Sequence, residues 1–234
     1  KPRVSLWSEQ PTGVSEKKPE AELSSAPPDG TAKPLSLRLD RFLLENGQFS
    51  YQGEPGQLTF NLNEIEASIK FDPSKASHLV EIQAGKGRLQ LGQGPLDLNS
   101  LKLKAEVSQQ KINIEDLSLV TAGSEILASG EITDYLGQPV FKLTSSARIN
   151  LAEISSVVGQ PGNLAGLISW DLKASGEARS PQISGQIAGS DLKFIGLSGV
   201  GLTASLEPGD NSSTQFKANV SLSTGSIALE AKLP

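Results

Sequence analysis

Residues that could act as acids, bases, nucleophiles or metal ligands are few and widely spaced in this chain. One histidine, His78, and no cysteine occur among its 234 residues. A single imidazole without a thiol cannot supply a usual zinc site or a Cys–His catalytic pair. The many serines are not accompanied by the G-x-S-x-G motif that marks the nucleophile of many hydrolases. We therefore expect His78 to be a surface or half-buried residue at the start of a strand, without an enzymatic role.

Paired carboxylates and glycine-rich stretches are the next candidates for chemistry. Glu115-Asp116 could perform acid–base catalysis, but the pair interrupts an alternating run and fits a solvated turn better. Gly85-Lys86-Gly87 and Gly92-Gln93-Gly94 lack the spacing of a phosphate-binding loop and fit the ends of strands. The net charge is −5 with both signs interspersed, so no basic surface for nucleic acid is indicated. We therefore expect that the chain is not an enzyme, that it binds no cofactor or metal, and that it has no nucleic-acid partner.

The strongest pattern in the sequence is the alternation of apolar and polar residues. From Leu96 to Val107 apolar residues occupy every second position, skip a beat at Asn99-Ser100 and then resume. Because alternate side chains share one face of a strand, the skip requires a bulge or a two-residue turn to keep that face apolar. The same phrase recurs around Asn63-Glu64, Glu115-Asp116 and Ser198-Gly199. Four copies predict a repeated antiparallel β unit.

The apolar positions of these four phrases are the candidate binding residues of the chain. In the second phrase they alternate with Asp97, Lys102, Lys104 and Glu106, which should face water. Two interpretations fit: a sandwich or barrel core filled by its own side chains, or the uncovered face of a concave sheet that takes acyl chains. Periodicity alone leaves both open. The candidate residues are Leu58, Phe60, Leu62, Ile65, Ile69, Phe71, Leu96, Leu98, Leu101, Leu103, Val107, Ile112, Ile114, Leu117, Leu119, Ile195, Leu197, Val200, Leu202 and Leu206.

Composition divides the chain into three parts. Residues 1–7 are interpreted as the end of a preceding strand, and the proline-rich stretch 8–34 as a disordered linker that buries too little apolar surface to fold. A repetitive antiparallel β domain is expected over 35–234, with a sub-boundary at 150–165. No apolar run approaches the roughly 18–20 residues that span a bilayer.

Local signals place turns and one helix within this domain. Asn46-Gly47 predicts a hairpin turn, and Gly85-Lys86 predicts a break between strands at 79–84 and 87–91. Asn150, followed by Glu153 three residues later, predicts the start of one short helix near 150–158. Gly159-Gln160-Pro161 predicts its end.

Two stretches resemble AsmA-like and TamB-type envelope proteins. Residues 166–194, G-L-I-S-W-D-L-K-A-S-G-E-A-R-S-P-Q-I-S-G-Q-I-A-G-S-D-L-K-F, are similar to the repeat that recurs along those chains. R-V-S-L-W at 3–7, the proline-rich gap and L-R-L-D-R-F-L-L-E-N-G-Q-F-S-Y at 37–51 resemble the beginning of AsmA family domains. The resemblance covers roughly residues 35–232. The amino-terminal membrane helix that these families carry is not in this sequence.

The resemblance implies a fold and a function. The fold would be a long antiparallel sheet curled into a U-shaped open groove, the β-taco, whose apolar trough carries phospholipid between inner and outer membranes. Phospholipid acyl chains and outer-membrane assembly proteins would be its partners. Its location would be the periplasm, with an inner-membrane anchor outside this sequence. Two alternatives stay open: an assembly chaperone that captures client strands at a sheet edge, and a structural β-solenoid spacer with a closed interior.

Overall fold

The structure is a computed structural model that describes residues 40–53, 59–91, 94–160, 162–194, 196–209 and 213–233. The chain divides into two units, Lys1–Arg38 and Leu39–Pro234, and every described residue belongs to the second. The strand end expected at 1–7 and the linker expected at 8–34 lie outside the described residues.

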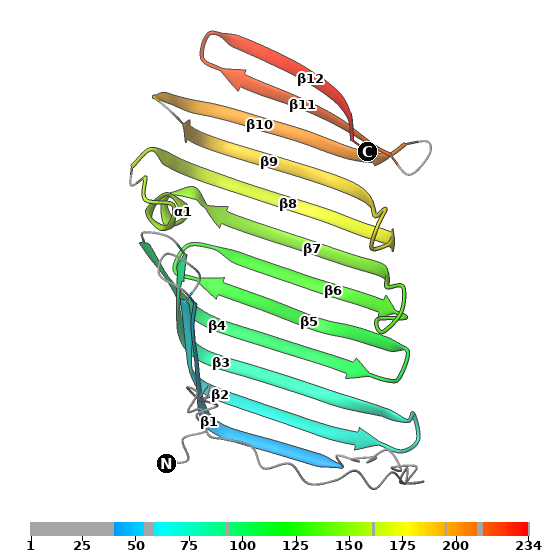
Figure 1. The fold of residues 1–234 in the computed structure, drawn as a ribbon. Helices are drawn as coiled ribbons and strands as arrows, with labels where there is room; N and C mark the ends of the chain where they lie inside the picture. The colour runs from blue at the N-terminus through cyan, green and yellow to red at the C-terminus, as the bar shows by residue number, and fades with distance from the viewer. Residues whose placement is uncertain are drawn as a thin grey trace, which may run out of the picture. The chain divides into compact units, whose positions relative to one another are not determined.

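The described part of the chain forms one open sheet of twelve antiparallel strands with a single short helix (Figure 1). Each strand pairs with the next in sequence, and β1 and β12 are the two edges. The all-β, antiparallel prediction is confirmed. The elements are β1 (Arg41–Gln52), β2 (Thr59–Asp72), β3 (Ser77–Leu91), β4 (Gly94–Val107), β5 (Lys111–Thr121), β6 (Glu125–Thr133), β7 (Val140–Asn150), α1 (Leu151–Val157), β8 (Leu164–Glu177), β9 (Gln182–Phe194), β10 (Leu197–Pro208), β11 (Thr214–Leu222) and β12 (Gly225–Leu233).

The skipped pairs of the sequence pattern lie inside continuous strands. Glu64 has φ 53° within β2, Gly199 has φ 68° within β10, and the pairing of β4 with β5 shifts at Asn99 and again at Glu115. These irregularities are bulges, so the two-residue turns that the pattern also allowed do not occur there.

Two turn predictions are wrong for the same reason. Asn46-Gly47 does not form a hairpin; both residues lie within β1, where Asn46 has φ 52° and the register with β2 shifts on either side of Gly47. Gly85-Lys86 does not separate two strands, since β3 is continuous from Ser77 to Leu91. The positive φ that Asn tolerates serves a bulge here as well as it would serve a hairpin.

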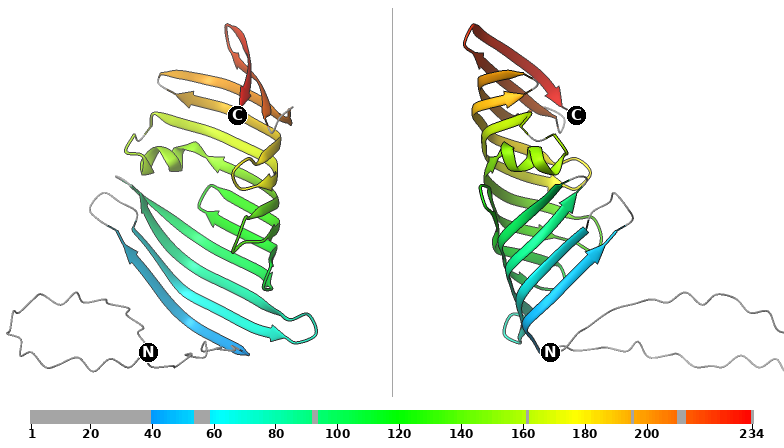
Figure 2. Two further views of the ribbon diagram at one scale, coloured as in Figure 1. Left: turned by 45° about the vertical axis from the view of Figure 1, so that its right-hand side comes forward. Right: turned by 90° about the vertical axis from the view of Figure 1, so that its left-hand side faces the viewer.

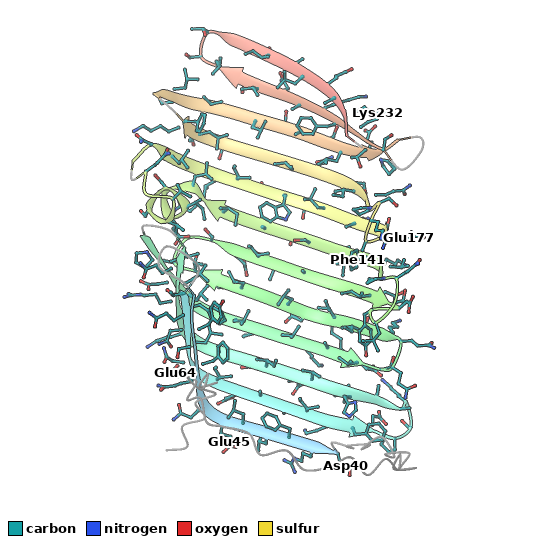
Figure 3. The ribbon with its side chains drawn as sticks, in the orientation of Figure 1. Asp40, Glu45, Glu64, Phe141, Glu177 and Lys232 are labelled. Atoms are coloured by element: carbon teal, nitrogen blue, oxygen red, sulfur yellow. The ribbon has the colours of Figure 1, made fainter. Side chains whose placement is uncertain are left out.

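Strands β1–β4 bend at these irregular positions (Figures 1 and 2). The register aligns Glu64 of β2 with Gly85-Lys86 of β3 and with Asn99-Ser100 of β4, so the bend runs across neighbouring strands. Figure 3 shows Glu45 and Glu64 at the bend. Glu64, Lys86 and Asn99 are exposed there.

The direction of the bend follows from burial. Ile65, Ala84 and Leu98, which flank the bend on the opposite face from these exposed residues, have relative exposures of 8%, 3% and 9%. Gly87 lies on this inner side, where a Cβ would be only 2.9 Å from the carbonyl oxygen of Asn61. The sheet therefore bends toward its apolar face. The stretches 48–52, 59–63, 86–91 and 94–99 are its bent segments.

Helix α1 confirms the single helix expected near 150–158. Asn150 is its N-cap, and the Asn150 side chain accepts a hydrogen bond from the Ala152 amide. The Val158 amide donates to the Ile154 carbonyl oxygen, and Gly159 follows with φ 70°. Only half of the expected capping box forms, because the Glu153 side chain turns to the β5–β6 turn instead of the Asn150 amide.

Candidate functional site: the apolar face of the sheet

The register extends the apolar alternation of single strands into rows that cross the whole sheet. Directly paired residues of antiparallel strands point to the same face, so each chain of pairs defines a row. One row runs without a polar member from β2 to β12: Ile65, Ala84, Leu101, Leu119, Ile126, Ala147, Trp170, Ile187, Ala204, Ala218 and Leu229. The next row contains one hydroxyl and no charge: Ala67, Ile82, Leu103, Leu117, Ala128, Ser145, Leu172, Gly185, Leu206, Phe216 and Ala231.

The opposite face is largely polar along an equivalent row. It contains Glu66, Gln83, Lys102, Ser118, Leu127, Ser146, Asp171, Gln186, Ser205, Lys217 and Glu230. The prediction that Leu101 and Leu103 point away from Lys102 and Lys104 is confirmed, because the two leucines are half-buried and both lysines are exposed. The sheet is therefore amphipathic over its full width.

No second layer covers the apolar face within the described residues. The buried apolar residues there are mostly alanines shielded by their neighbours, and the largest fully buried side chains are only Ser77 and Ser155. Larger members of the rows, such as Leu103 and Trp170, stay half-exposed. Since the sheet is single and open, the sandwich and barrel interpretations are wrong for this part of the chain.

The structure brings most of the predicted binding residues onto this face. Phe60 and Leu62 pair through Leu89 and Gly87 to Leu96 and Leu98, on the bent segments. The members from β2, β4 and β5 beyond the bend fall into common rows, among them Ile69 with Ile114 and Phe71 with Val107 and Ile112.

The remaining predicted residues belong to the fourth phrase. Val200 is buried, Leu202 and Leu206 are half-buried, and Leu197 is 56% exposed beside the β9–β10 turn. Leu58 and Ile195 lie outside the described residues.

Several apolar-face residues were missed because the four-phrase pattern did not include their strands. Ile126, Ala147, Trp170 and Ile187 lie in the unbroken row, on β6 to β9. The alternation L-I-S-W-D-L-K-A of residues 167–174 was a sufficient signal for Trp170. Its indole Nε1 donates a hydrogen bond to the Oγ of Ser145 at 3.2 Å. Ser145 carries the one hydroxyl of the second row, so this hydroxyl has a hydrogen-bond partner on the apolar face.

Ion pairs gather on the polar side and link neighbouring strands. Arg88 binds Asp97 at 2.7 Å, Lys104 binds Glu115 at 2.9 Å, and Lys111 binds Glu131 at 2.6 Å. The hydrogen bond from Arg88 lowers the pKa of Asp97, and that from Lys111 lowers the pKa of Glu131. All these side chains are well exposed, so each pair adds little to stability.

The Glu106 carboxylate joins a similar group at one end of β3. It accepts from the Ser77 hydroxyl at 2.7 Å and from Lys75 Nζ at 3.0 Å, and these bonds lower the pKa of Glu106. His78 is half-buried, as expected; it pairs with Phe71 and Val107 on the apolar face, and its ring lies 5.1 Å from that of Phe71.

Helix α1 is joined to the sheet by a second polar cluster. The Glu153 carboxylate accepts hydrogen bonds from the Thr121 hydroxyl at 2.7 Å, the Gly123 amide at 2.6 Å and the Ser124 hydroxyl at 2.6 Å. The Asn150 amide donates to the Ser124 Oγ at 3.0 Å. These bonds dock the start of α1 onto the β5–β6 turn.

No reactive constellation emerges from these groups. Among the described residues, no three His, Asp or Glu side chains gather as metal ligands, and no buried side-chain polar atom lacks a hydrogen-bond partner. An open hollow of about 500 Å³ on the polar face is lined by hydroxyl residues such as Ser129 and Thr144 together with the carboxylates Glu115, Asp116 and Asp171. The dominant chemical feature is thus the large apolar face.

Comparison of the chain with protein-family models, with curated proteins and with solved structures finds no match. The resemblance to AsmA-like proteins therefore depends on the sequence motifs at 37–51 and 166–194. No helix of the described residues has the length and apolarity needed to cross a membrane. The geometry of the sheet is thus the main basis for inferring a function.

Proposed function

We propose that the apolar face forms a trough that binds phospholipid acyl chains, and that the chain is a non-enzymatic segment of a lipid-transfer protein of the cell envelope. The observation that carries the proposal is the row from Ile65 to Leu229, which contains no polar residue from β2 to β12. Ten strand spacings of about 4.8 Å make this row roughly 48 Å long. The hydrocarbon core of a bilayer is only about 30 Å thick, so the row exceeds the length of any single acyl chain.

The bends support a trough rather than a flat surface. In this proposal the floor is the apolar face of β5–β12 together with the unbent parts of β1–β4. The wall consists of the bent segments, which project from the floor on the same side as α1 (Figure 2). Phe60, Leu62 and Leu96 give the wall an apolar lining.

Energetics favour a lipid ligand for such a surface. Half-exposed aliphatic side chains gain about 25 cal/mol for each Å² of apolar area that a ligand removes from water. Each methylene of an acyl chain contributes about 0.8 kcal/mol when it is buried. Charged residues lie on the other face, where Arg88, Lys104 and Lys111 each pair with a carboxylate, so a head group would remain in solvent at the open side.

Transport between membranes, periplasmic location and an inner-membrane anchor outside this sequence complete the proposal. They rest on the family resemblance, and a continuous apolar row is the physical property that such transport requires. Charge balance within the ion pairs of β3–β6 also gives no field that would favour nucleic acid.

A second candidate function, the capture of client strands during outer-membrane protein assembly, is favoured by one edge of the sheet. Strand β12 pairs with β11 over nine residues without a register shift, and Ile227 and Leu229 are 52% and 50% exposed. A regular edge strand offers unpaired backbone groups to an added strand. Edge β1 is less suited, because its bulge at Asn46-Gly47 interrupts the ladder.

The test of lipid binding uses the purified chain and its Trp170. Organic extraction followed by mass spectrometry should find co-purified phospholipid. After delipidation, vesicles of phosphatidylcholine with dibrominated acyl chains should quench Trp170 in a Trp7→Phe background, because bromine quenches tryptophan on contact. Vesicles with unbrominated chains are the control. If no phospholipid is extracted and Trp170 is not quenched, the proposal is refuted. If the chain binds only an unfolded outer-membrane strand, the second candidate is favoured.

A further inference from the structure

Helix α1 connects two parts of the sheet that the strand order keeps apart. It packs against β8, which follows it in sequence, and against β4, which β5, β6 and β7 separate from β8. It lies beyond the β5–β6 turn, next to the start of β4 (Figures 1 and 2). The tip of the bent segment of β4 thus meets the floor of the proposed trough through α1.

The two sides of α1 are attached in different ways. On the floor side, Glu153 and Asn150 hydrogen-bond to the β5–β6 turn, and the Leu164 amide at the start of β8 donates to the Ser155 Oγ at 3.3 Å. On the wall side, α1 meets β4 at Gly94, where the helix backbone at Ser156 and Val157 packs directly on the strand. In the described part of the chain, every hydrogen bond between α1 and the sheet belongs to the floor side.

Close packing at Gly94 makes this joint sensitive to a single atom. A Cβ on Gly94 would lie 2.1 Å from the Ser156 carbonyl oxygen and 3.1 Å from the Val157 nitrogen. Its three nearest neighbours would all be backbone atoms of α1, which cannot move without moving the helix. Gly94 does not have a positive φ, so a side chain would not strain β4 itself.

We propose that α1 is a releasable brace between wall and floor, and that opening of the Gly94–Ser156 joint widens the trough at its open side and so speeds the entry of acyl chains. This inference depends on the proposed lipid-binding function. Opening breaks no hydrogen bond between α1 and β4, whereas the bonds of Glu153 keep α1 on the floor. The wall then swings outward about the bend at Glu64, Gly85 and Asn99. The backbone already departs from regular strand geometry at Glu64, which has φ 53°, and at Asn99, where the register with β5 shifts.

The small size of the helix agrees with this role. α1 has seven residues, fewer than an isolated helix needs to persist in water. Val157 is its one buried apolar residue, at 5% exposure, while Val158 is 50% exposed. The joint between wall and floor is therefore held by very little apolar burial.

The first variant, Gly94→Ala, wedges the joint open. A matched control is Gly201→Ala on β10, where the added Cβ would meet only the side chain of Ser221, whose hydroxyl can rotate away. Both changes add one methyl group to a strand glycine, but only the first displaces α1. We expect Gly94→Ala to speed the quenching of Trp170 by brominated phosphatidylcholine vesicles by roughly threefold or more, with Gly201→Ala at the rate of the parent chain.

The second variant, Pro95→Cys with Ser156→Cys, locks the joint. Both positions are exposed and flank it, and the chain has no natural cysteine to compete for a short bis-maleimide. Crosslinking should slow quenching by roughly tenfold or more, while the same variant before crosslinking matches the parent. The amount of lipid bound at equilibrium should be the same in both forms.

The outcomes separate the brace from the lipid-binding function. A crosslinked protein that takes up lipid as fast as its own uncrosslinked form would overturn the brace, while leaving lipid binding intact. A parent chain that binds no lipid at all would refute the proposed function and the brace with it. Amide exchange gives a reading that needs no lipid: the α1 amides should exchange faster in Gly94→Ala than in Gly201→Ala, and equal exchange would also count against the brace.

Discussion

Leu103→Asp is the sharpest test of the apolar face, because it places one charge in the middle of the second row. Leu103 pairs with Ile82 on one side and Leu117 on the other, and all three lie on the uncovered face. Leu103 is only half-buried, so in the lipid-free protein the new carboxylate can keep much of its hydration. The loss of part of one leucine's burial should lower the free energy of unfolding by about 1–2 kcal/mol.

A bound acyl chain changes that balance. It would strip water from a carboxylate that has no partner in its row, and such desolvation costs several kcal/mol even after relaxation. If about 2–3 kcal/mol of this cost appears in binding, affinity for brominated phosphatidylcholine falls roughly 30- to 140-fold. The assay is the quenching of Trp170, after circular dichroism and melting temperature have shown that the variant is folded.

The control must carry the same charge on the polar face, and the structure selects Lys102 for it. Lys104 is unsuitable, because it forms an ion pair with Glu115 and lies opposite Asp116 and Glu81, so an aspartate there would meet three like charges. Lys102 lies opposite Gln83 and Ser118, and Lys102→Asp should leave lipid affinity unchanged. A folded Leu103→Asp that binds lipid as well as Lys102→Asp would refute the trough. Loss of folding in Leu103→Asp alone would show that this face is a covered core.

The other predictions concern α1, acid stability and the histidine. Glu153→Ala should lower the free energy of unfolding by about 1–3 kcal/mol and speed amide exchange in α1, because three donors of the β5–β6 turn lose their acceptor; unchanged exchange would contradict this docking. Since hydrogen bonds lower the pKa of Asp97, Glu106 and Glu131, their contribution to stability is present above about pH 4.5 and is lost as the pH falls through their depressed values. The melting temperature should therefore be level from about pH 7 to about pH 5 and fall below about pH 4, and a fall that begins near about pH 6 would point to other groups. His78→Ala should leave lipid binding and folding intact, measured by the same quenching and melting experiments, because its ring contacts Phe71 at the margin of the sheet; a folded variant that lost binding would show a role that we do not expect.

Much of the fold was predictable because it depends on local pattern. Alternation decides which side chains share a face, and it predicted the opposite faces of Leu101 and Lys102 without any tertiary information. The cap at Asn150 is equally local, since the side chain that stops the chain from continuing as a strand bonds an amide two residues away. Antiparallel order between neighbours also follows from short connections.

The sequence could not decide between a turn and a bulge, because both use the same residues. Asn46-Gly47 and Gly85-Lys86 suit a hairpin by their backbone preferences. Yet β2 pairs with β1 on both sides of Asn46-Gly47, and β2 and β4 pair with β3 on both sides of Gly85-Lys86. Pairing energy from neighbouring strands is summed over many residues and exceeds the local preference of two. The strand therefore bends instead of reversing.

Only the tertiary structure decided that no other described part of the chain covers the apolar face. A leucine in an alternating strand has the same sequence signature whether a second sheet, a barrel wall or solvent lies above it. The contact of Gly94 with Ser156 was equally hidden, since these residues are far apart in sequence and a glycine shows its purpose only when its neighbour is in place. Alternation fixes the direction of a side chain, while the distance to whatever lies in that direction depends on how the sheet bends.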